Sequence, residues 1–343
     1  MNALVVLVAL QWITGVEATV ASFSGTVSVA PPGGDLRAAQ KGEVLKESSR
    51  VKTGAQSEVT LVLSDGSTLK LREKSEMQVA VVKTEQQKPA MVLFFGRLWS
   101  KIATKVGGNQ FDVVTPSCVA GVRGTEFETA AGEDGSTRVT VNEGNVAVDN
   151  EKKQVAVGAG QQADGSTSGV DAPKSKSDTD WNKWNAEKRG NLQKNGEAIA
   201  RETKEKIDAR RAEAQALFEK QKALKEEYPN ATDARKAAIK EEVTKNARRL
   251  AELGVRATGQ FGAFEHWGEL ADDPEFGAKF TGSGYVRSEL KRLRRVKAEF
   301  DKMIAEGTDM SVRSLEKMMD DMGGGKKTIK DKKGSSKDDL FKE

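Results

Sequence analysis

The sequence has very little of the chemistry on which most enzymes depend. Its 343 residues contain one cysteine and one histidine, Cys118 and His266. A single cysteine excludes an intrachain disulfide and a zinc site built from several Cys and His ligands. A Ser-His-Asp or Cys-His arrangement would have to use His266. We therefore assign no catalytic residue, no metal ligand and no cofactor, and expect a protein that is not an enzyme.

An excess of charge of one sign is also lacking. The chain has 55 Lys and Arg against 51 Asp and Glu, a formal net charge of +4, which gives no reason to expect a nucleic-acid partner. Hydrophobic residues make up 37% and charged residues 31%, against about 45–50% and about 25% in typical globular domains. Part of the chain therefore does not build a deep core.

No apolar run is long enough to cross a bilayer, which takes about 20 residues. The short run Asn2–Ile13 is followed by Val16 and Ala18 at the −3 and −1 positions of a cleavage site. This pattern predicts a signal peptide at 1–18, a periplasmic or secreted protein, and no transmembrane segment after cleavage. No Lys or Arg precedes the run, so the alternative is a buried first strand or helix.

Residues 19–164 have the pattern of an all-β domain. Short alternating segments flank turn pairs that accept positive φ, at Asp65-Gly66, Asp134-Gly135 and Glu143-Gly144. Many short strands about 8–12 residues apart predict a sandwich, roll or solenoid.

An ordered series of motifs in this region resembles the FecR domain, the extracytoplasmic β module of bacterial envelope proteins. The motifs span about residues 20–165 and are "SGTVSV" (Ser24–Val29), "RVKTGAQSEVTLVLSDGSTLKL" (Arg50–Leu71), "LFFGRLWSKI" (Leu93–Ile102), "FDVVTPSCVAGVRGTEFE" (Phe111–Glu128), "VNEGNVAV" (Val141–Val148) and "VAVGAGQQ" (Val155–Gln162). The Trp-bearing segment Asp180–Arg189 is similar to a helix that often follows such domains. The resemblance implies a β fold and a place outside the cytoplasm. Signalling members also carry a cytoplasmic anti-sigma segment and a membrane helix before the β domain; here we expect only the β module.

The segment around Cys118 could be an active site or a packed turn. Pro116 ends a strand, the glycines free the backbone, and Cys118 lies among small apolar residues. Arg123 and Glu126 could pair across the bend, and Thr125 could bond a turn amide. We interpret the segment as a structural motif composed of Thr115, Pro116, Gly121, Arg123, Gly124, Thr125 and Glu126.

Beyond the β region the composition changes. Residues 165–180 are rich in Gly, Ser and charge and predict a linker, and the lysine-rich residues 323–343 predict a disordered tail. Between them, 181–322 predict a charged helical region. We expect helices at about 180–227, 233–253 and 285–306, with a short fourth carrying Leu315, Met318, Met319 and Met322. The first has a weak heptad, typical of a long solvated helix or a marginal coiled coil.

Aromatic residues gather between the second and third predicted helices. Phe261, Phe264, His266 and Trp267 are a candidate interaction surface. Aromatics in a helix connection more often fill the gap between the helices, and His266 beside Glu265 and Glu269 is a weak metal site.

Three functions remain open at this point. The first is an exported, non-enzymatic binding or docking module of the cell envelope, with a connection to signalling, whose partner is another envelope protein or a polysaccharide. The second is an envelope scaffold assembled through the helices. The third is an enzyme with paired carboxylates, for which no recognisable glycosidase setting is present.

Overall fold

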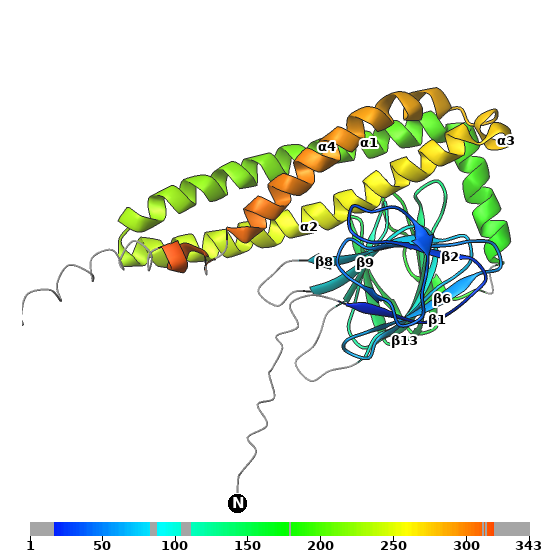
Figure 1. The fold of residues 1–343 in the computed structure, drawn as a ribbon, viewed down its shortest axis with the longest axis horizontal. Helices are drawn as coiled ribbons and strands as arrows, with labels where there is room; N and C mark the ends of the chain where they lie inside the picture. The colour runs from blue at the N-terminus through cyan, green and yellow to red at the C-terminus, as the bar shows by residue number, and fades with distance from the viewer. Residues whose placement is uncertain are drawn as a thin grey trace, which may run out of the picture.

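The computed structural model describes residues 17–82, 88–103, 111–177, 180–310, 312 and 314–318. A β domain is followed by long helices that lie across one side of it (Figure 1). This arrangement confirms the predicted fold class. Residues 1–16 of the predicted signal peptide, the predicted tail, Met319 and Met322 lie outside the described residues.

The strands form two sheets that share strand β9 (Lys88–Lys101). Sheet A contains the second half of β9 together with β1 (Ala18–Ser24), β4 (Val44–Leu45), β6 (Glu58–Leu63), β7 (Thr68–Leu71), β12 (Glu126–Ala131), β13 (Thr137–Glu143), β16 (Gln161–Gly165) and β17 (Lys174–Ser175). Sheet B contains the first half of β9 together with β2 (Val27–Ala30), β3 (Arg37–Ala38), β5 (Arg50–Thr53), β8 (Glu76–Val82), β10 (Phe111–Val114), β11 (Val119–Val122), β14 (Asn145–Asp149) and β15 (Gln154–Gly158). The β9–β10 pair is parallel and the other pairs are antiparallel.

Strand β9 passes from sheet B to sheet A at Gly96. Gly96 has a φ of +98°, and a Cβ there would overlap Ser75. The backbone of the next residue, Arg97, donates to the Ser75 hydroxyl at 3.0 Å. Because only glycine accepts both the φ and the close approach, this residue lets one strand serve two sheets.

The first half of β9 is buried on both faces. Met91 and Leu93 point into the core between the sheets, whereas Val92 and Phe94 belong to a second cluster that includes residues of helix α2 (Asp233–Asp272). Both faces of sheet B are therefore covered here, which explains why residues 90–95 read as a continuous apolar run instead of alternating.

Two boundaries of the predicted domains fall inside structured segments. Ala18, the last residue of the predicted signal peptide, begins β1 and is fully buried. The predicted linker 165–180 contains β17 and a bridge between Gly165 and Val170. Its composition is that of a linker, but backbone hydrogen bonds such as Lys176 N to Gly160 O hold it against the β domain.

The helical region contains three long helices, two short ones and a further helical turn at 314–318 in the part of the chain that the structure describes. The long and short helices are α1 (Trp181–Glu227), η1 (Tyr228–Asn230), α2 (Asp233–Asp272), α3 (Pro274–Gly277) and α4 (Ser283–Asp309). Helices α1, α2 and α4 bury a shared core. Leu315 of the expected fourth helix is buried in a smaller cluster beyond this core. No described helix is long and apolar enough to cross a membrane.

The predicted end of the second helix at residue 253 is wrong. Helix α2 continues to Asp272 and stops before Pro274, where Asp273 caps the next turn. The glycines that read as a connection lie inside the helix, at points of close packing. A Cβ on Gly259 would lie 3.0 Å from the Thr115 carbonyl oxygen, and a Cβ on Gly262 would overlap the Phe94 ring.

We predict opposite effects for two glycine-to-alanine changes within helices. Gly262→Ala should destabilise the protein by about 1–3 kcal/mol, because the buried Phe94 ring has no room for the methyl group. Gly190→Ala in α1 has nothing within 4 Å of the new Cβ and should stabilise it by up to about 1 kcal/mol through helix propensity. Urea unfolding of both variants tests this; equal effects would show that α2 does not need the close approach.

Candidate functional site

A groove of about 340 Å³ lies on the outer face of sheet A, away from the sandwich core. Strand register places the residues of its floor in two rows that cross the strands; Lys70 and Asp164 continue these rows just outside the lining. The first row begins at Arg72, just after the end of β7, and continues through Arg97, Ala130, Arg138 and Asp164 on β9, β12, β13 and β16. Ala130 is the small member of this row, and its short side chain leaves the groove deep between two arginines.

The second row lies beside the first and carries different chemistry. It runs Lys70, Trp99, Glu128, Thr140 and Gln162 over the same strands. The Lys70 ammonium lies 5.5 Å from the centre of the Trp99 ring. The rows together give the groove an arginine-rich side and a side with one indole and several hydrogen-bonding groups.

The start of helix α1 forms a wall of the groove. Trp181 and Trp184 line it, with ring centres 5.3 Å apart. The Arg97 guanidinium lies 5.0 Å from the Trp181 ring, and that of Arg138 lies 5.1 Å from Trp184, within cation–π range. Asp180 fixes this wall by accepting a hydrogen bond from the Asn182 amide, which caps α1. Trp184 is buried, whereas Trp99 and Trp181 are half-exposed to the groove.

The charges that line the groove do not balance. Four cationic side chains, Arg72, Arg97, Arg138 and Lys176, line it with one carboxylate, Glu128. Two carboxylates outside the lining also pair with these cations, Glu58 with Arg72 and Asp164 with Arg138. Glu128 lies 3.8 Å from Arg97 and 3.9 Å from Arg72, too far for a good hydrogen bond to either. The buried Nε atoms of these two arginines have no hydrogen-bond partner.

Arg138 is anchored at the far side of the groove. Its Nε donates to Asp164 at 2.5 Å, and Lys174 lies 3.0 Å from the same carboxylate. Burial acts to raise the pKa of Asp164, but hydrogen bonds from Arg138 and Lys174 outweigh it and lower the pKa. Asp164 is therefore a carboxylate, and it holds Arg138 in place.

The groove residues were not singled out from the sequence, although a signal was present. In "GRLWSK" (Gly96–Lys101), Arg97, Trp99 and Lys101 alternate with Leu98 and Ser100, which puts a tryptophan on the polar face of a strand. Nothing in the sequence shows that Trp181, some 80 residues later, returns to the same face.

The residues of the predicted structural motif lie in a different place, beneath helix α2. The Thr115 amide donates to the Cys118 carbonyl at 2.8 Å, and the Cys118 amide donates to the Thr115 hydroxyl at 3.0 Å. Gly259 of α2 packs on this Thr115-Pro116 turn. Cys118 is buried, and burial raises the pKa of its thiol.

The rest of the motif follows the turn into β11 and β12. Gly121 lies in β11, and Gly124 has a φ of +61°. The expected Arg123–Glu126 pair is not formed, because Glu126 lies 3.4 Å from Lys101 and accepts from Asn142, whereas Arg123 is exposed. The buried Thr125 hydroxyl has no hydrogen-bond partner, so it does not bond a turn amide.

The candidate interaction surface is an internal interface of this chain. Phe261, Phe264 and Trp267 are at most 3% exposed. Trp267 donates its indole N–H to the Glu133 carbonyl of the β domain at 2.6 Å. Phe261, Phe264 and Trp267 are therefore not free for a partner, because α2 turns them toward the β domain and the other helices, whereas His266 is half-buried.

His266 is held as a neutral aromatic ring. It stacks on Phe95 at 3.6 Å between ring centres, and neither buried ring nitrogen has a hydrogen-bond partner. Burial, with smaller contributions from Lys52 and Arg189, lowers its pKa to about 3. Glu265 and Glu269 pair with Arg294 and Lys52 instead. Among the described residues, no group of His, Cys, Asp and Glu could hold a metal ion.

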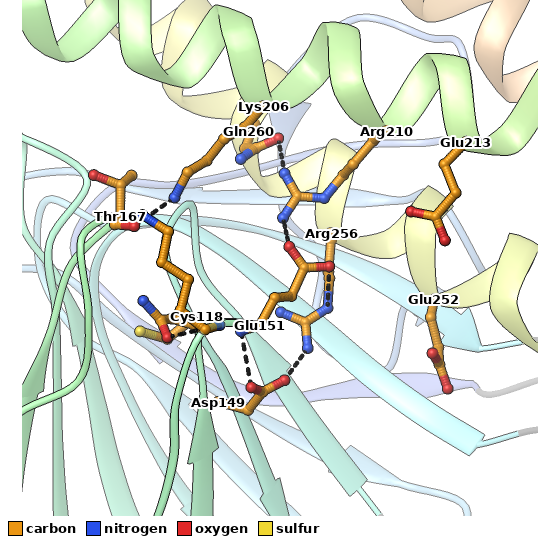
Figure 2. A network of polar contacts seen from close by, with 12 residues as sticks. Cys118, Asp149, Glu151, Thr167, Lys206, Arg210, Glu213, Glu252, Arg256 and Gln260 are labelled. Atoms are coloured by element: carbon orange, nitrogen blue, oxygen red, sulfur yellow. Dashed lines mark hydrogen bonds and ion pairs between the residues drawn. The ribbon is translucent and has the colours of Figure 1, made fainter.

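A charged cluster joins the β14–β15 turn to the helices, as Figure 2 shows. Arg210 of α1 donates to Gln260 at 2.6 Å and to Glu151. Arg256 of α2 pairs with Asp149 and lies 3.7 Å from Glu151. Lys206 of α1 donates to the Thr167 carbonyl at 2.7 Å. The arginines pair with Asp149 and Glu151, and Lys206 bonds a backbone carbonyl, so we interpret the cluster as a brace between the two parts of the chain.

The β domain matches a known family. A model of the FecR protein family matches residues 49–147. This match confirms the resemblance read from the motifs, over the central part of the range in which they occur. It covers neither the first strands nor the helical region.

Solved structures give a partial likeness. Two crystal structures of a protein assigned as an anti-sigma factor from Parabacteroides distasonis are each 20% identical to the chain, with TM-scores of 0.34 and 0.33. The alignments cover 39% and 37% of this chain, and 63% and 59% of those chains. The chain thus spans less than two thirds of the length of these structures. No curated protein matches the chain.

We predict that Glu151 stabilises the contact between the β domain and the helices. Glu151→Gln should lower the free energy of unfolding by about 1–3 kcal/mol, because it leaves the 9%-exposed Arg210 without its carboxylate. Glu299→Gln removes an exposed pair with Arg211 and should change it by less than about 0.5 kcal/mol. Chemical unfolding measures both; equal losses would contradict the bracing role of Glu151.

We predict that His266 makes stability depend on pH. In the unfolded chain it binds a proton below about pH 6.5, but in the folded chain only near its pKa of about 3. Its contribution to stability is therefore lost as the pH falls from 6.5 toward 3. His266→Phe keeps the stacking on Phe95, so its stability relative to wild type should rise by about 2–3 kcal/mol between pH 7 and pH 4.5. A constant difference across this range would contradict the burial of a neutral imidazole.

Proposed function

We propose that the protein is a non-catalytic binding module of the bacterial cell envelope and that the groove on sheet A is its binding site. The carrying observation is the lining of the groove: four cations and one carboxylate line it, together with the half-exposed rings of Trp99 and Trp181. A groove with an excess of cations attracts a negatively charged ligand. The FecR match supports a place in the envelope, as does the predicted signal peptide.

In this proposal the helices hold the binding domain rigidly. Helix α2 packs on sheet B, and the charged cluster ties α1 and α2 to the β14–β15 turn. Helix α1 also contributes Trp181 and Trp184 to the groove wall. The bundle therefore acts as a fixed arm that completes the site.

The alternative, a scaffold that assembles through the helices, has less support. The apolar faces of α1, α2 and α4 pack on one another within the chain. The large apolar side chains that are exposed in the described residues, Phe23, Leu36 and Val44, lie in the β domain. Among the described residues, the outer surface of the helices therefore offers no comparable apolar stripe on which a second set of helices could pack.

A capture experiment tests the proposed function. The full chain, immobilised, is incubated with solubilised envelope from the native bacterium, and the retained protein and carbohydrate are quantified. Wild type and Arg123→Ala, an exposed arginine outside the groove, should retain the same component. Arg97→Ala and Trp99→Ala should each retain at least tenfold less, as expected for central binding residues. Equal retention by all four proteins, with folding verified by circular dichroism, would refute the proposal.

A further inference from the structure

We infer that the ligand of the groove is an acidic polysaccharide, one whose sugar rings carry carboxylates. The inference rests on the proposed function and narrows it to one ligand class. It follows from the position of the groove on the sheet, from its two rows of side chains, and from the spacing of the arginines.

The groove crosses the face of sheet A and does not follow a strand edge. Its floor strands β7, β9, β12 and β13 are hydrogen-bonded on both sides. An extended peptide gains affinity on a sheet by main-chain hydrogen bonds to an open edge, and these strands offer none. A ligand here must be recognised by side chains alone, which favours a polymer that carries its polar groups along its whole length.

The arginine row supplies sites for carboxylates. Arg97 and Arg138 lie on strands separated by β12, a distance of two strand spacings or about 10 Å. Ala130 lies between them and leaves room for the ligand. A planar guanidinium matches a carboxylate with two parallel hydrogen bonds. An acidic chain running across the strands would meet Arg72, Arg97 and Arg138 in turn, with Arg97 as its main site because Arg72 already pairs with Glu58 and Arg138 with Asp164.

The second row and the wall supply what a sugar ring needs. Trp99 and Trp181 are half-exposed to the groove, and the electron-rich face of an indole attracts the polarised C–H groups of a pyranose. Thr140 places a hydroxyl group beside these rings, and such a group can both donate to and accept from sugar hydroxyls. Asn142 and Gln162 also line the groove, but they bond Glu126, Lys176 and Ser177 within the chain. An acidic peptide without rings would leave the indoles unused.

Titration calorimetry at low salt with defined oligomers tests the inference on the full chain. The acidic probes are hexamers of galacturonate, mannuronate and hyaluronan; maltohexaose is the neutral control and hexaglutamate the peptide control. At least one acidic hexamer should bind at least tenfold more tightly than both controls. Arg97→Ala and Trp99→Ala should each weaken that binding at least tenfold, whereas Arg123→Ala should change it less than twofold. Raised salt should weaken it, because the charges are partly exposed.

Each other outcome overturns the inference. Hexaglutamate binding as tightly as the best acidic sugar would make the ligand an acidic peptide, and equal binding of maltohexaose would remove the role of charge. If no acidic hexamer binds below millimolar concentration while envelope capture still depends on Arg97 and Trp99, the ligand class is wrong and the proposed function stands. If envelope capture does not depend on Arg97 and Trp99 either, both the ligand class and the proposed function are refuted.

Discussion

The contact between helix α2 and sheet B is the constraint on which the rest of the structure depends. Gly259 and Gly262 bring the helix backbone onto the Thr115-Pro116 turn and the Phe94 ring, at distances that a larger residue would prevent. The apolar outer side of sheet B is thereby buried, and such a surface would otherwise be an aggregation or association site. The FecR-like motif around Cys118 thus serves as a docking platform inside this chain.

Because helix α2 covers sheet B, sheet A is the sheet whose outer face carries the groove. Because α2 packs on the outside of sheet B, the open face is the outer face of sheet A, where polar residues alternate with core residues along β9, β12 and β13. The first turns of α1 lie on this same face and narrow it into a groove. One chain therefore uses its helices in two ways, as a cover for sheet B and as a wall on sheet A.

Much of this fold could be predicted from the sequence, because its signals are local. Turn pairs such as Asp65-Gly66 and period-two alternation indicate the strands, and the cap at Asp180 and Pro229 mark the limits of α1. The end of α2 could not be predicted, since a glycine inside a helix and a glycine in a loop look alike in sequence. What distinguishes them here is the Phe94 ring, which comes from a strand more than 160 residues earlier.

The candidate groove could not be predicted from the sequence, for a related reason. Its residues come from β7, β9, β12, β13 and α1, and only strand register brings Arg97, Ala130 and Arg138 into one row. The aromatic cluster at Phe261–Trp267 was the more visible feature, yet its side chains are used for packing. An aromatic cluster in one stretch of sequence most readily forms one face of a helix, and a helix face is easily buried. Trp99 and Trp181 reach the groove from two separate elements, β9 and α1, and stay half-exposed because they do not form one face of a single element that a neighbour could bury.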